Sequence, residues 1–317
     1  MLNKIKKIWL IGPGNIGFDY LKVLQSLHQY NLPVDITVIG RSPKPDWPVE
    51  VYEHGLDSYI ESTNDIPDYA IIATDESELY TVTKKLINIG ISNILIEKPA
   101  ALYLNEIKDL HDTSITHDCN LFIGYNRRFY QSVQECKRRI DLSPGPISIT
   151  FSFTEWPHMI PFDTYTTEEL HRFFLCNSSH IPDTVFYLAG QPKELNCYTS
   201  GKLEWHPSAA IFIGSGVTEH NILFNYDANW DSAGRWSIEI SLPGEKLILR
   251  PIEKLHIQNK GSLEVHEYKL QNEKIDSIHK PGLYNEVKSF LTLQDNLCTI
   301  VEHFNNFKWY KDIANYK

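Results

Sequence analysis

Short apolar runs alternate with amphipathic stretches over the first part of the chain. The runs that predict strands are Lys7–Ile11, Val34–Ile39, Tyr69–Ala73, Asn93–Ile96 and Leu121–Gly124. The stretches that predict helices are Asn15–Tyr30, Asp75–Ile89 and Leu104–His117. Strands and helices that alternate at this spacing indicate βαβ units and a parallel sheet. We therefore predict an α/β domain over residues 1–123.

The pattern changes after Pro144-Gly145-Pro146, where apolar and polar residues begin to alternate. The apolar positions of the first such stretch are Ile147, Ile149, Phe151 and Phe153. Similar stretches follow at Ala209–Ile213, Thr218–Tyr226, Trp236–Leu242, Lys246–Arg250 and Leu263–Leu270, with Gly214-Ser215-Gly216 among the expected turns. A period of two predicts strands with one buried and one solvated face. Residues 124–317 are therefore expected to form a second domain with a mostly antiparallel sheet.

Helices are also expected in this second domain. The stretches that predict them are Thr167–Phe174, Ile181–Leu188 and the tail Leu283–Tyr310. Thr166 followed by Glu169 predicts a capping box, in which the two side chains bind each other's backbone N–H groups. The expected class is thus α/β followed by α+β.

Composition excludes several classes of protein. The formal net charge of −10 over 317 residues argues against nucleic acid and anionic membranes as partners, since both attract basic surfaces. The five cysteines form no CxxC pair and the histidines no HExxH motif, so we expect neither disulfides nor a metal. The basic start is followed only by the short apolar run Ile8–Ile11, and no apolar stretch could cross a bilayer. We expect a cytoplasmic protein.

A glycine-rich loop follows the first predicted strand and opens the first predicted helix. It reads Gly12-Pro13-Gly14-Asn15-Ile16-Gly17. Glycines at this spacing allow a tight turn and a close approach of the backbone to a pyrophosphate, which then faces the helix N-terminus. The loop predicts a dinucleotide site, and the alternative is a purely structural glycine turn.

The end of the second predicted strand indicates which dinucleotide binds. NAD-binding proteins carry an acid there for the ribose 2′-hydroxyl. This chain has Gly40-Arg41-Ser42 instead, a cation and a hydroxyl that suit a 2′-phosphate. The pattern favours NADP(H) over NAD(H), unless Arg41 is only a solvated surface charge.

Glu97-Lys98-Pro99 closes the apolar run Ile94–Ile96. Ligands of open α/β sheets bind outside the carboxyl ends of the strands, so Lys98 is expected at a ligand. A dinucleotide loop and a lysine at a later strand end together favour hydride transfer. The alternative is a surface lysine beside a loop proline.

With these residues, the chain resembles the Gfo/Idh/MocA (glucose-fructose oxidoreductase / inositol dehydrogenase) family over nearly its whole length. Besides the glycine loop, the motifs in family order are Ala73-Thr74, Glu97-Lys98-Pro99, Gly124-Tyr125-Asn126-Arg127-Arg128-Phe129, His180-Ile181-Pro182-Asp183, Tyr187-Leu188-Ala189-Gly190 and Lys280-Pro281-Gly282-Leu283-Tyr284. The resemblance implies a Rossmann domain, a mostly antiparallel sheet domain and a carbohydrate-like substrate in the cleft between them. It also implies homodimers or homotetramers, and contacts of Thr74, Glu97 and Asn126 with the cofactor.

The resemblance further implies that Lys98 and His180 flank the reacting carbon of a sugar or polyol. Histidine titrates near neutrality and can shuttle the hydroxyl proton, while a lysine ammonium stabilises a developing alkoxide. If Ser178 or Ser179 caps the helix, the helix dipole keeps His180 neutral. Alternatively the helix starts earlier, through Cys176, or His180 is only a structural histidine.

Four further residues are substrate candidates, Arg127 and Asn126 among them by the same resemblance. Arg127 is expected at nicotinamide or substrate, as is Asn126. Asp183 is expected to orient His180 or bind a hydroxyl, with a helix-terminal charge as the alternative. Trp156 is expected to wall the pocket or to pack within a loop. Arg128 is expected as a surface or domain-bridging charge.

Cys176 marks a departure from the family, because many members carry an aspartate four residues before the histidine. A thiol cannot form a carboxylate's charge-assisted hydrogen bonds, so the substrate or the partner of His180 must differ. Cys176 is a candidate substrate contact, although a buried filler is the commoner role.

The sequence thus predicts an NAD(P)-dependent oxidoreductase acting on a sugar, sugar nucleotide or polyol. The alternatives are a non-catalytic nucleotide-binding sensor on the same scaffold and a reductase of a non-sugar carbonyl or imine. Retention of both Lys98 and His180 favours an enzyme, because a sensor needs neither.

Overall fold

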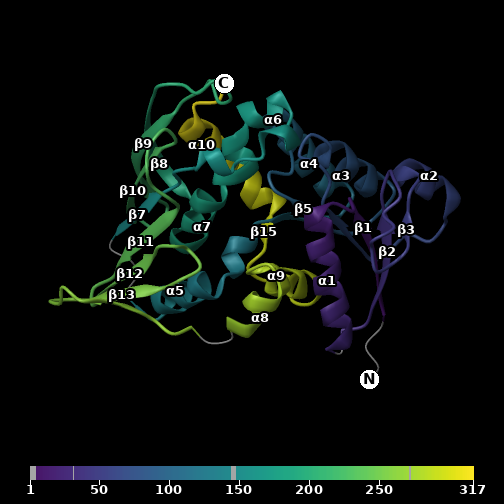
Figure 1. Ribbon diagram of the computed structural model, residues 1–317, viewed down its shortest axis with the longest axis horizontal. Coiled ribbons are helices and arrows are strands. Elements are labelled where there is room, and N and C mark those ends of the chain that lie inside the picture. The colour runs from purple at the N-terminus through teal and green to yellow at the C-terminus, as the bar shows by residue number, and fades with distance from the viewer. Residues whose placement is uncertain (1–4, 31, 144–147, 271–272) are drawn as a thin grey trace. The chain divides into compact units, whose positions relative to one another are not determined.

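The computed structural model describes residues 5–30, 32–143, 148–270 and 273–317, in two compact units (Figure 1). The first unit comprises Met1–Asn126 and Ser277–Phe304, and the second Arg127–Asp276 and Asn305–Lys317. The division falls after Asn126 instead of after residue 123, and Ser277–Phe304 belong to the first unit. Pro144-Gly145-Pro146 and Ile147, where the sequence pattern changes, lie outside the described residues.

The first unit contains a sheet in the order β15-β6-β5-β4-β1-β2-β3. Its strands are β1 (Lys6–Ile11), β2 (Val34–Ile39), β3 (Val51–Tyr52), β4 (Tyr69–Ile72), β5 (Asn93–Glu97), β6 (Asn120–Gly124) and β15 (Cys298–Thr299). All neighbours pair in parallel except β15 and β6. This is the Rossmann order, in which the direction of winding reverses between β1 and β4.

Helices cover the parallel sheet, so its strands are nearly continuous apolar runs. They are α1 (Asn15–Gln29), α2 (Gly55–Ser62), α3 (Leu79–Asn88), α4 (Leu104–Thr116) and α9 (Leu283–Leu291), while the 3₁₀ turn η1 (Asn126–Phe129) begins at Asn126 and continues in the second unit. Helix α1 packs against α9, and α3 against α4 (Figure 1). The tail predicted as one helix is interrupted, because β15 pairs with β6 between α9 and α10 (Ile300–Ala314).

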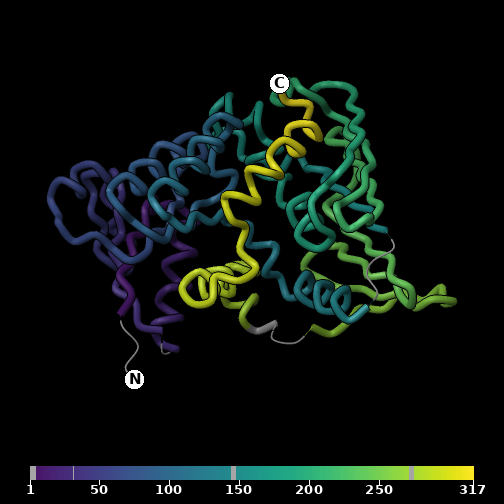
Figure 2. The backbone as a smooth tube through the Cα atoms, turned by 180° about the vertical axis from the view of Figure 1, so that it is seen from behind, coloured from purple at the N-terminus to yellow at the C-terminus, as the bar shows by residue number. Residues whose placement is uncertain are grey.

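The second unit contains a sheet in the order β14-β13-β12-β11-β7-β10-β9-β8, whose segments are coloured mainly green in Figure 2. Its strands are β7 (Ser148–Ser152), β8 (Pro192–Ser200), β9 (Ile211–Thr218), β10 (Leu223–Asn229), β11 (Ser237–Ser241), β12 (Glu245–Leu249), β13 (His256–Asn259) and β14 (Val265–Glu267). Only β7 and β10 pair in parallel among these described strands. The predicted mostly antiparallel sheet is confirmed.

Helical segments accompany this sheet, and α7 packs on β7 and β11. The segments are α5 (Gln131–Asp141), η2 (Pro157–Met159), η3 (Phe162–Thr164), α6 (Thr167–His171), the π-helical turn η4 (Phe174–Ser178), α7 (His180–Ala189) and α8 (Glu273–Ile278), which ends two residues after Asp276, the last residue of this segment of the unit. The alternating residues Ile149, Phe151 and Phe153 are buried. The capping box of Thr166 and Glu169 is present as predicted. No helix in the described ranges is long and apolar enough to cross a bilayer.

The turn expected at Gly214-Ser215-Gly216 is wrong, because these residues lie inside β9. A Cβ atom on Gly214 would lie 2.4 Å from the ring of Tyr226, and one on Gly216 would lie 2.6 Å from the ring of Phe224. Both glycines therefore make room for aromatic rings of the neighbouring strand. The stretch expected as one strand, Thr218–Tyr226, contains a turn in which Asn221 has a φ of +60°.

Candidate functional site

The glycine loop of the first unit connects β1 to α1. Gly12 has a φ of +96°, and a Cβ atom there would lie 2.4 Å from the carbonyl oxygen of Ala73. A Cβ atom on Gly17 would lie 2.1 Å from the carbonyl oxygen of Gly12, so both positions require glycine. At Gly14, by contrast, an added Cβ meets nothing within 4 Å. The loop packs on its own unit through two glycines and leaves open space at the third.

Helix α1 begins at Asn15 with Gly14 at its N-cap and no side-chain cap. The first N–H groups of a helix have no partner within the helix, and the helix dipole makes this end electropositive. A terminus that follows a tight glycine turn can bind a phosphate through backbone groups alone.

A pocket of about 240 Å³ lies at the carboxyl ends of β1, β2 and β4. Its lining includes six of the predicted cofactor residues, namely Gly12, Pro13, Gly14, Arg41, Ser42 and Thr74. This position is the switch point of the sheet, where open α/β folds bind ligands. The buried Thr74 hydroxyl has no hydrogen-bond partner among the described residues, so it remains available to a ligand.

Charged residues that the sequence reasoning missed also line this pocket. They are Lys44, Asp75 and Glu78. Arg41 is 67% exposed, and its Nη1 donates to Glu78 Oε1 at 2.5 Å while Nη2 lies 3.8 Å from Asp75 Oδ2. The two acids follow β4 in sequence, so the Gly40-Arg41-Ser42 motif at the end of β2 does not indicate them. Arg41 is not a lone surface cation.

The other predicted cofactor residues of the first unit lie outside the pocket lining. The hydroxyl of buried Tyr20 donates to Glu97 Oε1 at 2.8 Å, which links α1 to the end of β5. Burial, and then the Glu97 charge, raise the pKa of Tyr20 well above its ordinary value, so this hydroxyl stays a donor. Asn126 Nδ2 donates to the carbonyl oxygen of Pro281 at 3.0 Å.

Lys98 follows β5 directly, as the sequence predicts. Its side chain is only 14% exposed, and Nζ lies 3.7 Å from Glu76 Oε1. The ammonium is therefore mostly shielded from solvent and accompanied by a carboxylate at longer than hydrogen-bond distance. A weakly hydrated ammonium is a stronger electrostatic group than one in open water.

His180 is the first residue of α7 in the second unit, but the turn η4 leads directly into this helix. The Ser179 hydroxyl donates to the carbonyl oxygen of Leu175 at 2.8 Å, and the Ser178 hydroxyl donates to Glu155 at 2.5 Å. Ser179 stands at the N-cap of α7 without a side-chain cap bond, and His180 lies in the first turn of the helix. The π-helical turn that precedes α7 includes Cys176, as the alternative of an earlier helical start has it.

Arg127 provides another reason for a neutral imidazole. Its Nη1 lies 2.9 Å from His180 Nε2. A guanidinium group can only donate, so Nε2 must accept, and the ring is the neutral tautomer that carries its proton on Nδ1. The structure thus brings together two predicted site residues of the second unit and leaves the lone pair of the imidazole on Nε2.

Glu155 is a buried acid next to this pair that the sequence reasoning missed. Its Oε1 accepts from Ser178 at 2.5 Å, from Asn177 at 3.0 Å and from the indole of Trp236 at 3.2 Å. The ring centre of Trp236 lies 6.2 Å from that of His180. Burial raises the pKa of the Glu155 carboxyl, while the donors around it act in the opposite direction. The sequence signal that could have identified Glu155 is its position three residues after the buried strand β7.

Asp183 is buried one turn after His180 and binds Arg128. Arg128 donates from Nε at 2.8 Å and from Nη2 at 2.6 Å to the two carboxylate oxygens. The prediction that Arg128 is a surface charge is wrong, because it is 1% exposed. A bidentate partner is what allows both charges to be buried.

Cys176 and Trp156 lie in different surroundings. The Cys176 thiol is buried and lies 3.7 Å from the carbonyl oxygen of Glu169. Trp156 is 40% exposed, and its indole N–H donates to the carbonyl oxygen of Gly234 at 2.5 Å. Across the described ranges, no three His, Cys, Asp or Glu side chains are grouped to hold a metal ion.

Comparison with known proteins identifies a family model that matches part of the chain. Residues 6–125 match the family model described as "Oxidoreductase family, NAD-binding Rossmann fold". YceM of Salmonella typhimurium, a protein named as an oxidoreductase, is 24% identical over 152 residues. That match covers 47% of this chain and 46% of YceM, so it spans about half of either protein.

Solved structures resemble the chain over nearly its full length. An oxidoreductase from Agrobacterium radiobacter in complex with NAD⁺, L-tartaric acid and magnesium has a TM-score of 0.80 at 14% identity, with 98% of this chain and 96% of that one covered. An inositol dehydrogenase homologue from Azotobacter vinelandii, complexed with NADH and myo-inositol, has a TM-score of 0.76 at 12% identity, with 99% and 96% covered. At these identities the likeness is one of fold.

Proposed function

Since the chain belongs, through residues 6–125, to the Gfo/Idh/MocA oxidoreductase family with an NAD-binding Rossmann fold, we propose that it is an NAD(P)-dependent dehydrogenase or reductase. It transfers a hydride between nicotinamide and a hydroxyl or carbonyl carbon of a sugar, sugar nucleotide or polyol. The observation that carries the proposal is the pocket at the strand-order reversal, lined by Gly12, Gly14 and Thr74. The polyol and hydroxy acid bound by the structural neighbours support the substrate class.

The pocket fits part of a dinucleotide. An added Cβ at Gly14 would meet nothing within 4 Å, which leaves space for a phosphate, and the Thr74 hydroxyl can hydrogen-bond to a ligand. A volume of about 240 Å³ is small for a whole dinucleotide, since sites for drug-sized ligands begin at about 300 Å³. We assign the adenosine half to this pocket, with the pyrophosphate at the start of α1.

For the cofactor, we propose NADP(H) ahead of NAD(H). Arg41, Ser42 and Lys44 line the end of the pocket beside β2 and supply two cations and a hydroxyl for a 2′-phosphate. Glu78 and Asp75 compete for Arg41 and lower this preference. Thermal unfolding with each cofactor tests the choice, because a ligand at about 100 times its Kd adds roughly 2.7 kcal/mol of stability. A larger shift with NAD at matched concentrations would reverse it.

In this proposal His180 exchanges the proton of the substrate hydroxyl. The bound nicotinamide supplies the hydride acceptor in oxidation and the hydride donor in reduction. The Nε2 lone pair that accepts from Arg127 is the basic position, and a substrate hydroxyl takes the place of the guanidinium N–H. Lys98 stabilises negative charge on the substrate oxygen, and its low exposure strengthens that effect.

Nicotinamide absorbance tests the proposal with panels of sugars, nucleotide sugars and polyols. We expect turnover by the wild type and a loss of about 10²–10³ in kcat for Lys98→Ala, as for the removal of one oxyanion donor. Lys108→Ala is the matched control, because Lys108 is a 61% exposed lysine of α4 paired with Asp112. Cofactor binding without turnover on any panel member would instead favour the sensor.

We also propose that the protein forms a homodimer or homotetramer. On the described sheet of the second unit, Tyr198 of β8 and Ile213 of β9 are direct neighbours and are 71% and 53% exposed. Adjacent exposed apolar side chains of this kind favour self-association. Light scattering of the purified chain measures the assembly, and a monomer at micromolar concentration would refute it.

A further inference from the structure

Arg235 is a partly exposed arginine near His180 that the proposed chemistry does not use. Its side chain is 45% exposed, and its guanidinium carbon lies 4.8 Å from the ring centre of Trp156 and 5.1 Å from that of Trp236. Contacts with both indoles restrict the position of the guanidinium. A guanidinium that stacks through its face keeps its N–H donors in the plane for other partners.

The nearest carboxylate does not use those donors. Arg235 Nη1 lies 3.6 Å from Glu155 Oε2, which is beyond hydrogen-bond distance. Glu155 is buried, and its other oxygen accepts from Ser178, Asn177 and Trp236. No hydrogen bond to the Arg235 side chain occurs among the residues that the structure describes. The acid offsets part of the charge and leaves the donors available.

Trp236 connects this arginine to His180. The indole ring centre lies 5.1 Å from the Arg235 guanidinium and 6.2 Å from the His180 ring centre. The Arg127 guanidinium lies 5.6 Å from the same indole and 2.9 Å from His180 Nε2. The guanidinium groups of Arg127 and Arg235 therefore both lie against the indole of Trp236, and that of Arg127 also contacts the imidazole.

The two acids shown beside these arginines, Glu155 and Asp183, are buried. Asp183 is buried and accepts from Arg128 through both oxygens, and Glu155 is 2% exposed.

We propose that the substrate carries an oxyanion, a carboxylate or a phosphate, which binds to Arg235 between Trp156 and Trp236. The sugar is thus an acid or a phosphate ester instead of a neutral polyol. The inference rests on the proposed function, since it assigns the substrate class of the His180 site. Guanidinium groups bind both oxyanions through paired N–H···O bonds, so the experiment separates the two.

Isothermal titration of the cofactor-loaded protein with D-glucuronate, D-glucose 6-phosphate and D-glucose tests the proposal. We expect wild type to bind at least one of the two anions about tenfold or more tightly than glucose, and the preferred anion identifies the group. Arg235→Gln is expected to lose about tenfold or more in affinity for that anion and none for glucose. Arg235→Lys keeps the charge but lacks the paired N–H donors of a guanidinium group. Its affinity for that anion should therefore lie between those of the wild type and Arg235→Gln.

Arg138→Gln is the control, because Arg138 is a 54% exposed arginine of the same unit, paired with Glu135. Equal binding of anions and glucose, no binding of either anion, or an unchanged Arg235→Gln would each overturn the inference. Thermal unfolding confirms that the variants are folded.

Nicotinamide absorbance in the same samples separates the two proposals. Anion binding without turnover on any panel sugar refutes only the redox function, whereas turnover of neutral sugars with no response to Arg235→Gln refutes only the anionic substrate.

Discussion

The two units build their candidate sites in different ways. In the first unit, the loop Gly12–Gly17 is made by backbone, with glycines where a side chain would collide with neighbouring carbonyl oxygens. In the second unit, side chains from separate segments meet around His180, among them Arg127, Glu155 and Trp236. A backbone site depends on a few adjacent residues, whereas a side-chain site depends on burial and pairing across the whole unit.

Gly12→Ala should break the backbone site most severely. The added Cβ would lie 2.4 Å from the Ala73 carbonyl oxygen at a φ of +96°. We expect a loss of about 5 kcal/mol in the free energy of unfolding, because overpacking and backbone strain act together. Urea unfolding of the protein without cofactor measures it.

Gly14→Ala is the matched comparison within the same loop. Its Cβ meets nothing within 4 Å and its φ is −91°, so we expect less than about 1 kcal/mol change in unfolding free energy. The methyl group would fill the space assigned to the pyrophosphate, so the Kd for the cofactor should rise. Unchanged cofactor affinity in a folded Gly14→Ala protein would contradict the assignment of this loop.

Breaking the Arg128–Asp183 pair should show how far the second unit depends on side-chain pairing. Both groups are buried, and Arg128→Ala removes the bidentate donor from the Asp183 carboxylate. We expect a loss of about 3–5 kcal/mol in unfolding free energy, because removal of one partner of a buried ion pair is costly. Asp183→Asn should lose less, since it remains an acceptor.

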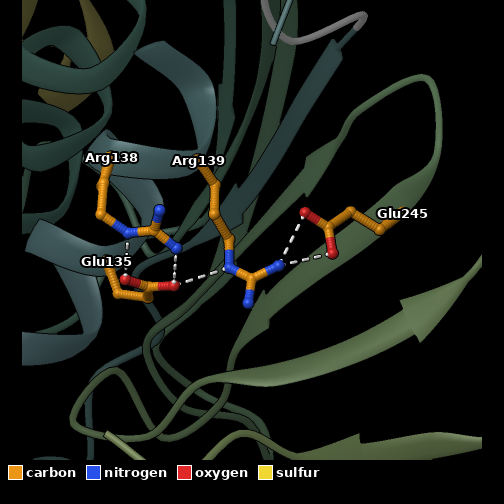
Figure 3. Close-up of polar contacts among 4 residues, drawn as sticks. All are labelled: Glu135, Arg138, Arg139 and Glu245. Atoms are coloured by element: carbon orange, nitrogen blue, oxygen red, sulfur yellow. Dashed lines mark hydrogen bonds and ion pairs between the residues drawn. The ribbon is translucent and has the colours of Figure 1, made fainter. Parts of the chain in front are cut away.

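The α5 network is the exposed counterpart of that pair (Figure 3). Arg138 makes two bonds of 2.7 Å to Glu135, and Arg139 connects Glu135 to Glu245 of β12. Arg138→Ala should leave the urea midpoint nearly unchanged, because Arg138 is 54% exposed and Glu135 keeps its bond to Arg139. Destabilisation equal to that of Arg128→Ala would refute the distinction between buried and exposed pairs.

His206 provides the smaller, pH-dependent test of the second unit. Its Nε2 accepts from the Tyr316 hydroxyl at 2.8 Å, and its Nδ1 donates to the Ala209 carbonyl oxygen at 2.8 Å. Burial lowers the pKa of His206 to about 4, so between about pH 6.5 and 4 the unfolded chain binds the proton more tightly. The free energy of unfolding should therefore fall by about 3 kcal/mol as the pH drops through that window.

Urea unfolding at pH 7 and pH 4.5 measures this contribution. His206→Gln removes the titrating ring, so its unfolding free energy should change less between the two pH values than that of the wild type. The difference between the two proteins isolates His206 from the other titrating groups. Equal pH dependence in both would show that the ring is already protonated in the folded state.

Local pattern was enough to predict the parts of the fold that depend on neighbours in the chain. The apolar runs became the parallel strands, and Thr166 with Glu169 formed the predicted capping box. The pattern failed where another strand decided the outcome. Gly214 and Gly216 look like a turn, yet they lie in β9 because the rings of Tyr226 and Phe224 occupy the space above them.

The sequence by itself determined the dinucleotide loop, the strand that ends at Lys98 and the change from a parallel to a mostly antiparallel sheet. These follow from the spacing of glycines and apolar residues, which acts over a few positions. Only the tertiary structure decided that Arg128 is buried on Asp183, that Glu155 receives three donors and that Arg127 holds His180 neutral. The physical reason is that a charge changes its role with burial and partner, and both come from residues far away in the chain.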